Sequence, residues 1–242
     1  VAVLAVTAFH YLGLFWQQPA AVAQLLGIAP TTPTAAAVAL GSYFGPNRWF
    51  SLGHFGVALF FLVSGFVIPF AFVRQSRVAF AVGRFWRLWP TYAVGLTCAV
   101  ALVALARVGT GTPLLPTAST LAWNYALGLR DLAGAPSLDG VVWTLEIEIR
   151  FYLMCMLLAP ALREGRPRPV VAAILAVAAL AGGAEVVSAT HGRAWTLASY
   201  TAAVHGPIVI VMLLGTLCNL WFRRTLSRGF FAGGAAVGSG AC

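Results

Sequence analysis

Long apolar runs constrain what this chain can fold into more than any other feature. Six of them, at residues 1–16, 53–73, 89–106, 141–162, 170–187 and 197–222, are separated by segments that hold most of the arginines. A run of about 20 apolar residues is long enough to cross, as a helix, the roughly 30 Å hydrocarbon layer of a bilayer. We therefore expect an all-α fold, a polytopic bundle of transmembrane helices with about six complete spans.

The composition excludes a water-soluble alternative. Only 9% of the 242 residues are charged, 60% are hydrophobic, and the mean hydropathy is +0.88. Soluble domains carry about 25% charged residues, so soluble enzymes, disordered chains and small disulfide scaffolds are ruled out. The apolar tail at 229–242 is too short for a span and is expected to begin a seventh. We expect one membrane-embedded domain over 1–242, incomplete at both ends.

The arginines predict the orientation. Four, three and three of them lie in the segments 74–88, 163–169 and 223–228, against one, two and one in 17–52, 107–140 and 188–196. Because arginine-rich loops stay in the cytoplasm, we expect the N-terminus inside and segment 17–52 outside, in a bacterial inner membrane. The net charge of +9 does not indicate nucleic-acid binding, since the arginines punctuate apolar runs and form no single basic patch.

The cysteines do not predict a metal site. Cys98, Cys155, Cys218 and Cys242 lie in or beside apolar runs and form no CxxC pair. They are typical of small buried apolar side chains.

Ionisable residues inside the apolar runs are the strongest candidates for function, because each is costly in a membrane unless it is paired or used. His10 lies six residues before Trp16, roughly 9 Å below the outer end of its span, and Glu148 lies roughly 8 Å below the outer end of the fourth. At matching depths the two side chains could form a general base and its orienting partner. A structural hydrogen bond, or a proton relay in a transporter, is equally compatible with this placement.

Two further pairs follow from helical spacing. Glu146 and Arg150 are four residues apart and are expected to form a local ion pair, with Glu148 on another side of the helix. Arg84 and Arg87 share a helix face and suit a phosphate or pyrophosphate group. Their alternative role is topology and contact with lipid head groups. The Ser-Gly pair at 64–65 indicates helix packing rather than a nucleophile.

Four motifs, in order, carry a resemblance to a known family. They are AVTAFHYLG around His10, GHFGVALFFLVSGFVIP in the second apolar run, RFWRLWPTY before the third, and WTLEIEIRFYL over 143–153. Together they resemble the acyltransferase-3 family of bacterial membrane acyltransferases. The last motif matches the family signature Trp-Ser-Leu-x-x-Glu-x-x-Phe-Tyr-Leu, with Thr144 in place of the serine.

The resemblance implies transfer of an acyl group, commonly acetyl, from cytoplasmic acyl-CoA to a hydroxyl of a sugar or glycan-type acceptor, without a metal. It implies that Arg84 and Arg87 bind the phosphates of CoA. Acyl-CoA, a glycan or glycosylated small molecule, and the lipid bilayer are then the expected partners, and nucleic acid is not.

The same resemblance implies roles for the other motif residues. His10 would deprotonate the acceptor hydroxyl or relay the acyl group, and Glu148 would orient His10 or hold the acceptor. Trp143 and Tyr152, two of the aromatic residues of the signature, would bind substrate.

Two other functions remain open. A proton-coupled transporter would also use an intramembrane histidine and glutamate, but it would not consume acyl-CoA. An inert fragment of the acyltransferase would keep the same motifs without activity.

Overall fold

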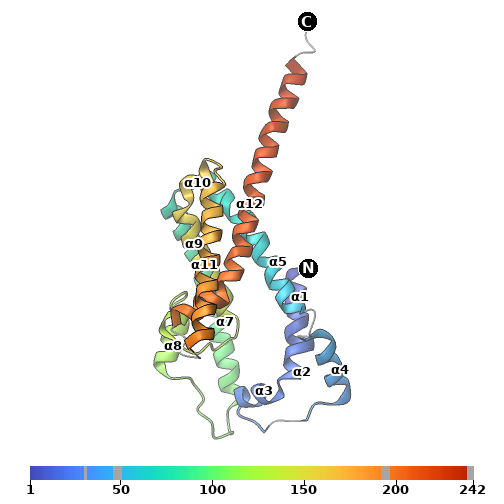
Figure 1. Cartoon of the computed structure of the whole chain (residues 1–242). Coiled ribbons are helices and arrows are strands. Elements are labelled where there is room, and N and C mark those ends of the chain that lie inside the picture. The colour runs from blue at the N-terminus through green and yellow to red at the C-terminus, as the bar shows by residue number, and fades with distance from the viewer. Residues whose placement is uncertain (30–31, 46–50, 192–196, 239–242) are drawn as a thin grey trace. The chain divides into compact units, whose positions relative to one another are not determined.

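The structure, a computed structural model, describes residues 1–29, 32–45, 51–191 and 197–238. Its regular elements over these ranges are all helical (Figure 1), so the all-α prediction is confirmed. The chain divides into two compact units, each made of two stretches. The first unit comprises Val1–Phe60 and Phe85–Glu146, and the second comprises Phe61–Arg84 and Ile147–Cys242. That the whole chain is one domain stays a prediction.

The N-terminal part of the first unit holds a continuous helical run followed by two short helices. These are α1 (Ala2–Ala8), the π-helical η1 (Phe9–Leu14), α2 (Phe15–Gln17), α3 (Pro19–Leu26) and α4 (Ala35–Phe44). Helix α4 is not expected from the sequence; it begins after Thr34, whose hydroxyl accepts a hydrogen bond from the Ala37 backbone N–H at 3.3 Å.

Helix α7 (Arg77–Ala106) corrects the predicted loop at 74–88. The preceding span, Leu52–Arg74, consists of α5 (Leu52–Val67), η2 (Ile68–Phe70) and α6 (Ala71–Arg74). Only Gln75 and Ser76 separate the two helices, because the Ser76 hydroxyl caps α7 by accepting from the Ala79 backbone N–H at 3.1 Å. Arg84 and Arg87 therefore lie two to three turns inside a helix.

The remaining helices lie in the second half of the chain. They are α8 (Ala118–Tyr125), η3 (Asp131–Ala133), α9 (Val142–Leu157), α10 (Ala159–Arg163), α11 (Arg168–His191) and α12 (Leu197–Gly238). Helix α12 runs without interruption through 223–228, where a loop before a seventh helix is predicted. That stretch contains no proline or glycine before Gly229, so nothing in it ends a helix. Residues 192–196 of the predicted loop at 188–196 lie outside the described residues.

Over the residues that the structure describes, four helices are long and apolar enough to cross a membrane. They are Leu52–Arg74, Arg77–Ala106, Arg168–Val187 and Ala202–Arg224, and they correspond to predicted spans two, three, five and six. The first and fourth predicted spans are shorter, since Ala2–Gln17 and the 16 residues of α9 each extend about 24 Å at 1.5 Å per residue. The chain is a multi-pass membrane protein, and the number of six complete spans stays a prediction.

Small residues bring α5 and α12 together in the second unit. A Cβ atom on Gly65 would lie 1.9 Å from the Met212 carbonyl oxygen, so only glycine fits there. The Thr216 hydroxyl donates to the Gly65 carbonyl at 3.1 Å, and the Asn219 amide donates to the Phe66 carbonyl at 2.8 Å. Close backbone approach with polar side chains across it is typical of packed membrane helices. The helix-packing interpretation is confirmed for Gly65.

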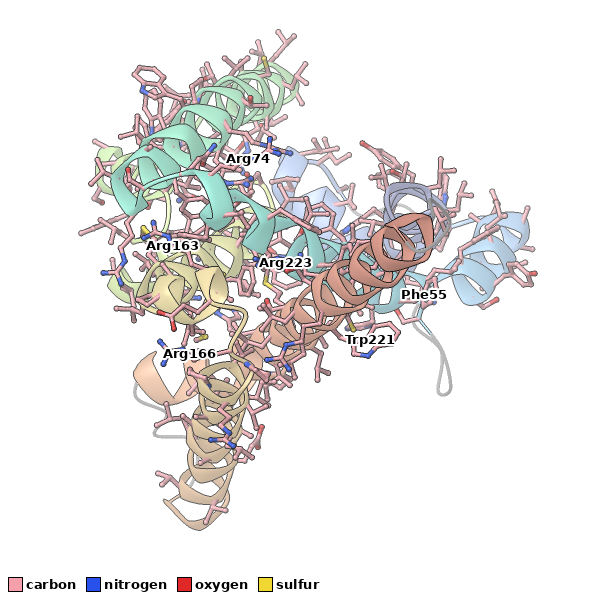
Figure 2. The ribbon with its side chains drawn as sticks, turned by 90° about the horizontal axis from the view of Figure 1, so that it is seen from above. Phe55, Arg74, Arg163, Arg166, Trp221 and Arg223 are labelled. Carbon is pink, nitrogen blue, oxygen red and sulfur yellow. The ribbon has the colours of Figure 1, made fainter. Side chains whose placement is uncertain are left out.

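Arginines gather at one end of the second unit, which Figure 2 views from above. Arg163 donates to the carbonyls of Phe72 and Gln75 at 3.1 and 3.0 Å, and Arg223 donates to the Leu162 carbonyl at 2.9 Å. These bonds hold the α6–α7, α10–α11 and mid-α12 segments at the same end. The three arginine-rich segments thus lie together, as the orientation hypothesis requires, and the side of the membrane that they face stays a prediction.

Candidate active site

The residues predicted for function are divided between the two units. His10, Arg87 and Trp143 belong to the first, and the other three predicted residues, Arg84, Glu148 and Tyr152, belong to the second. The meeting of His10 with Glu148 stays a prediction.

Arg84, Tyr152 and Glu148 form one connected cluster in the second unit. The Arg84 guanidinium carbon lies 5.2 Å from the centre of the Tyr152 ring. The Tyr152 hydroxyl in turn donates a hydrogen bond to the Glu148 carboxylate, one turn earlier in α9. Tyr152 is 5% exposed and Glu148 is 8% exposed. The structure therefore links the predicted CoA-binding arginine to the predicted catalytic glutamate through a buried tyrosine.

Phe80 is a member of this cluster that the sequence analysis missed. Its ring centre lies 5.1 Å from the Arg84 guanidinium carbon and 5.5 Å from the centre of the Tyr152 ring, which it meets edge to face. Cation–π contacts of this kind stabilise a charge that has lost part of its water. Phe80 is four residues before Arg84, so helical spacing could have identified it once α7 was known to begin at Arg77.

His10 lies in the π-helical segment η1, half buried in the first unit. Its ring meets the Phe9 ring edge to face at 5.4 Å, and Phe9 also faces the ring of His54 at 6.5 Å. A Cβ atom on Gly53 would lie 2.5 Å from the Phe9 ring, so this glycine allows α5 to approach η1. Single π-helical turns are rare and frequently occur at functional sites, a signal that the apolar pattern did not contain.

Glu146 forms an ion pair, but the predicted partner, Arg150, is wrong. Arg130, in the loop after α8, binds Glu146 with two parallel hydrogen bonds of 2.9 and 2.7 Å, and the Asp131 backbone N–H adds a third at 3.2 Å. Glu146 is fully buried. Arg150 instead contacts the ring of the buried His205 in the second unit. Helical spacing predicted Arg150 because it considers only local pairs, whereas a fork-shaped partner from a loop can bond both carboxylate oxygens.

Hydrogen bonds at the start of α9 position Trp143. The Asp139 carboxylate accepts from the backbone N–H groups of Val141 and Val142, both at 3.0 Å. The Trp143 indole N–H donates to the Gly140 carbonyl at 3.1 Å. The helix start is thereby fixed, and the indole ring is held against it.

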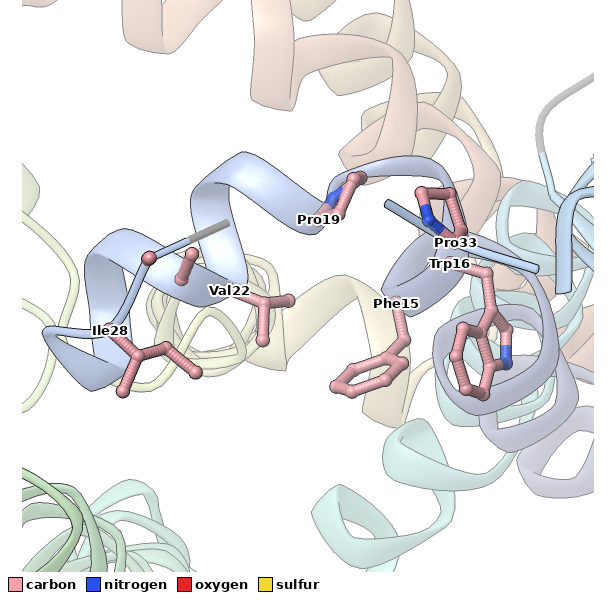
Figure 3. Close-up of a pocket in the computed structure, with 8 residues that line it drawn as sticks. Phe15, Trp16, Pro19, Val22, Ile28 and Pro33 are labelled. Atoms are coloured by element: carbon pink, nitrogen blue, oxygen red, sulfur yellow. The ribbon is translucent and has the colours of Figure 1, made fainter. Parts of the chain in front are cut away.

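Cavities of different size lie in the first unit. A small apolar one of about 70 Å³ is lined by Phe15, Trp16, Pro19 and Val22 among others (Figure 3), and none of its lining residues is charged. A larger one of about 450 Å³ extends along α7 from Arg87 and is also lined by Tyr92 and Asp139. The larger cavity includes Arg87, a residue predicted for function.

Among the described residues, no group of three or more histidine, cysteine, aspartate or glutamate side chains could hold a metal ion. Cys155 is buried as predicted, whereas Cys98 and Cys218 are exposed. The prediction failed for these two because an apolar environment in a membrane helix does not require burial within the protein. Cys242 lies outside the described residues.

Comparisons with known proteins agree with the four sequence motifs. The family model described as an acyltransferase domain, that of the acyltransferase-3 family, matches residues 1–241. The chain is 29% identical over 188 residues to Nodulation protein 10 of Rhizobium leguminosarum bv. viciae, an alignment covering 70% of this chain and 49% of that protein. The chain thus spans about half the length of the curated relative it matches. No solved structure matches it. Given the matched family and its membrane-spanning helices, the chain belongs to the acyltransferase-3 family of membrane acyltransferases.

Proposed function

We propose that this protein moves an acyl group, acetyl in the first instance, from cytoplasmic acyl-CoA to a hydroxyl of a sugar or glycan-type acceptor. Arg84 and Arg87 bind the donor phosphates, and His10 acts as the general base. The observation that carries the proposal is the Arg84–Tyr152–Glu148 cluster, since it joins an anion-binding group to a buried carboxylate in a chain of this family.

Binding of the acyl donor depends on how the Arg84 side chain is held. Its guanidinium packs over the rings of Phe80 and Tyr152. The N–H donors of a guanidinium point outward in its plane, so stacking on aromatic rings leaves donors for phosphate oxygens. Arg87 lies three residues further along α7 and is exposed. Two fixed positive charges on one helix face suit a diphosphate better than a single charge does.

The chemical step needs a base and a way to hold it. His10 takes the proton of the acceptor hydroxyl as the oxygen attacks the thioester carbonyl carbon. The carbon–sulfur bond breaks, and the CoA thiolate leaves and recovers the proton. Glu148 stabilises the positively charged imidazole, and Tyr152 fixes the Glu148 carboxylate in place.

A transfer assay tests this proposal. Membranes containing the whole protein would be given acetyl-CoA with a labelled acetyl group, and label would be followed into the envelope glycans of the producing bacterium. We expect transfer that is absent from a deletion strain. If glycans remain unlabelled and acetyl-CoA is not consumed, the acyltransferase proposal is wrong for this protein.

A double Arg84→Ala, Arg87→Ala variant tests the donor site. We expect much weaker acetyl-CoA binding, with partial recovery in the double lysine variant, because an ammonium keeps the charge but not the fork of donors. Unchanged binding in the double alanine variant would show that the two arginines serve topology alone.

A further inference from the structure

The larger cavity of the first unit follows one face of α7. Its residues on that helix form two neighbouring rows, each with a spacing of four residues. One row is Arg87, Thr91, Gly95 and Ala99, and the other is Leu88, Tyr92 and Leu96. Twelve residues separate Arg87 from Ala99, so the cavity extends roughly 18 Å along the helix. The opposite wall is formed by Asp139, Val141 and Leu145. A volume of about 450 Å³ is within the range of small-molecule sites.

The cavity changes character along its length. Arg87, one of the two proposed phosphate-binding residues, lies at one end, and Leu96 and Ala99 lie at the other. Leu145 and Val141 make the facing wall apolar, and one oxygen of the Asp139 carboxylate accepts hydrogen bonds from two backbone N–H groups. A molecule that fits has a phosphate group at one end and a long, mostly apolar chain behind it.

One buried polar group favours CoA over a phospholipid, two molecules that both have this form. Tyr92 is 7% exposed, and its hydroxyl has no hydrogen-bond partner among the described residues. A buried hydroxyl without a partner loses the hydrogen bonds it made in water. A phospholipid tail could not satisfy it, whereas the pantetheine arm of CoA carries amide and thioester carbonyls that could.

We propose that this cavity holds the acyl-pantetheine arm of the donor, with the Tyr92 hydroxyl donating a hydrogen bond to one of its carbonyl oxygens. The inference rests on the proposed function and deepens it, because it assigns the arm a path along α7 that begins at Arg87. Gly95 keeps the path open, since a Cβ atom there would meet no described atom within 4 Å.

A matched pair of glycine variants tests the path. Gly95→Leu fills the cavity, whereas Gly83→Leu places the same side chain on the same helix, also in open space, outside the cavity. Binding would be measured with the whole protein in lipid nanodiscs, using CoA and adenosine bisphosphate, the nucleotide end of CoA without its arm. We expect Gly95→Leu to weaken CoA binding roughly tenfold or more and to leave adenosine bisphosphate binding unchanged. Gly83→Leu should change neither.

Tyr92→Phe tests the polar contact. It removes only the hydroxyl, which bonds no described residue, so the unfolding temperature should not fall. We expect CoA binding to weaken about 3- to 10-fold, the effect of one lost neutral hydrogen bond. A fall in unfolding temperature with unchanged CoA binding would show a structural role and overturn this assignment.

Three results overturn the inference in distinguishable ways. If the unchanged protein uses acetyl-CoA and both Gly95→Leu and Tyr92→Phe bind CoA normally, the arm lies elsewhere and the proposed function stands. If Gly95→Leu instead loses a co-purifying phospholipid while CoA binding is unchanged, the cavity is a lipid site. If the unchanged protein neither binds nor consumes acyl-CoA, the inference and the proposed function both fail.

Discussion

At the scale of single residues, the contacts of Tyr152 give different roles to its ring and its hydroxyl. The ring packs against the Arg84 guanidinium, and the hydroxyl binds the Glu148 carboxylate. In the proposed reaction the first contact serves donor binding and the second serves the chemical step. Substitutions can therefore separate the two contributions.

The first prediction uses that separation. Tyr152→Phe keeps the ring beneath Arg84, so we expect kcat for acetyl transfer to fall while KM for acetyl-CoA stays within about twofold. Glu148→Gln should lower kcat about 10- to 100-fold, the value of a hydrogen bond to a charged group. Steady-state kinetics of the whole protein measure both. Tyr43→Phe, at a tyrosine that is 76% exposed, is the control. A change in KM alone would assign Tyr152 to donor binding only.

The second prediction concerns the buried ion pair. Glu146→Ala leaves the Arg130 guanidinium buried without its carboxylate, and we expect a loss of roughly 3–5 kcal/mol in the free energy of unfolding. Glu164→Ala breaks the Arg166–Glu164 pair, in which both side chains are more than half exposed, and should cost less than about 1 kcal/mol. Unfolding of both variants in detergent would be compared. Equal losses would contradict the structural role of the Arg130–Glu146 pair.

At the scale of helices, the sequence predicted what apolar runs determine directly. The spans at 53–73 and 170–187 agree with helices because hydropathy over a window of that length decides membrane crossing. The start of α7 was missed because four arginines within 74–88 were interpreted as a loop, although Ser76 is a capping residue. The partner of Glu146 was missed because a contact between segments 16 residues apart has no local spacing signal.

The site was predictable to a similar extent. Motif residues identified Arg84, Glu148 and Tyr152 separately, but helical spacing could not show that Arg84 would lie over a ring 68 residues away in the sequence. The π-helical turn at His10 had no signal either, since its residues have the same apolar pattern as an ordinary helix.

The third prediction belongs to the α5–α12 contact. Gly65→Ala adds a Cβ atom that would overlap the Met212 carbonyl, and backbone on both helices must move. We expect destabilisation of roughly 1–3 kcal/mol, the usual cost of overpacking. Gly83→Ala adds the same atom to open space and should stabilise by up to about 1 kcal/mol through helix propensity. Thermal unfolding checks both, and an unaffected Gly65→Ala variant would contradict the close approach.

At the scale of the whole molecule, the arginine distribution sets the orientation. Arg163 and Arg223 hold three arginine-rich segments at one end of the second unit. If these segments face the cytoplasm, α7 begins on the side of the membrane where acyl-CoA is made. The proposed donor-binding arginines then lie two to three helical turns from that side.

The fourth prediction is topological. Single cysteines at Gln75, Glu164 and Thr32 would be introduced into the protein after its native cysteines have been replaced. We expect Gln75 and Glu164 to react only with a membrane-permeant reagent, and Thr32 to react also with an impermeant one. Labelling of Gln75 and Thr32 from the same side would overturn the proposed orientation.

The central claim is that His10 drives acyl transfer from acyl-CoA, and one measurement tests it most directly. Label transfer from acetyl-CoA to the native acceptor would be followed in the whole protein and its His10→Ala variant, at equal membrane insertion. Histidine is the side chain best suited to exchange a proton near neutral pH. We expect turnover to fall about 10²- to 10⁴-fold, the contribution of a general base. Near-normal turnover in His10→Ala, with loss in His205→Ala, would contradict the account and move the base to His205.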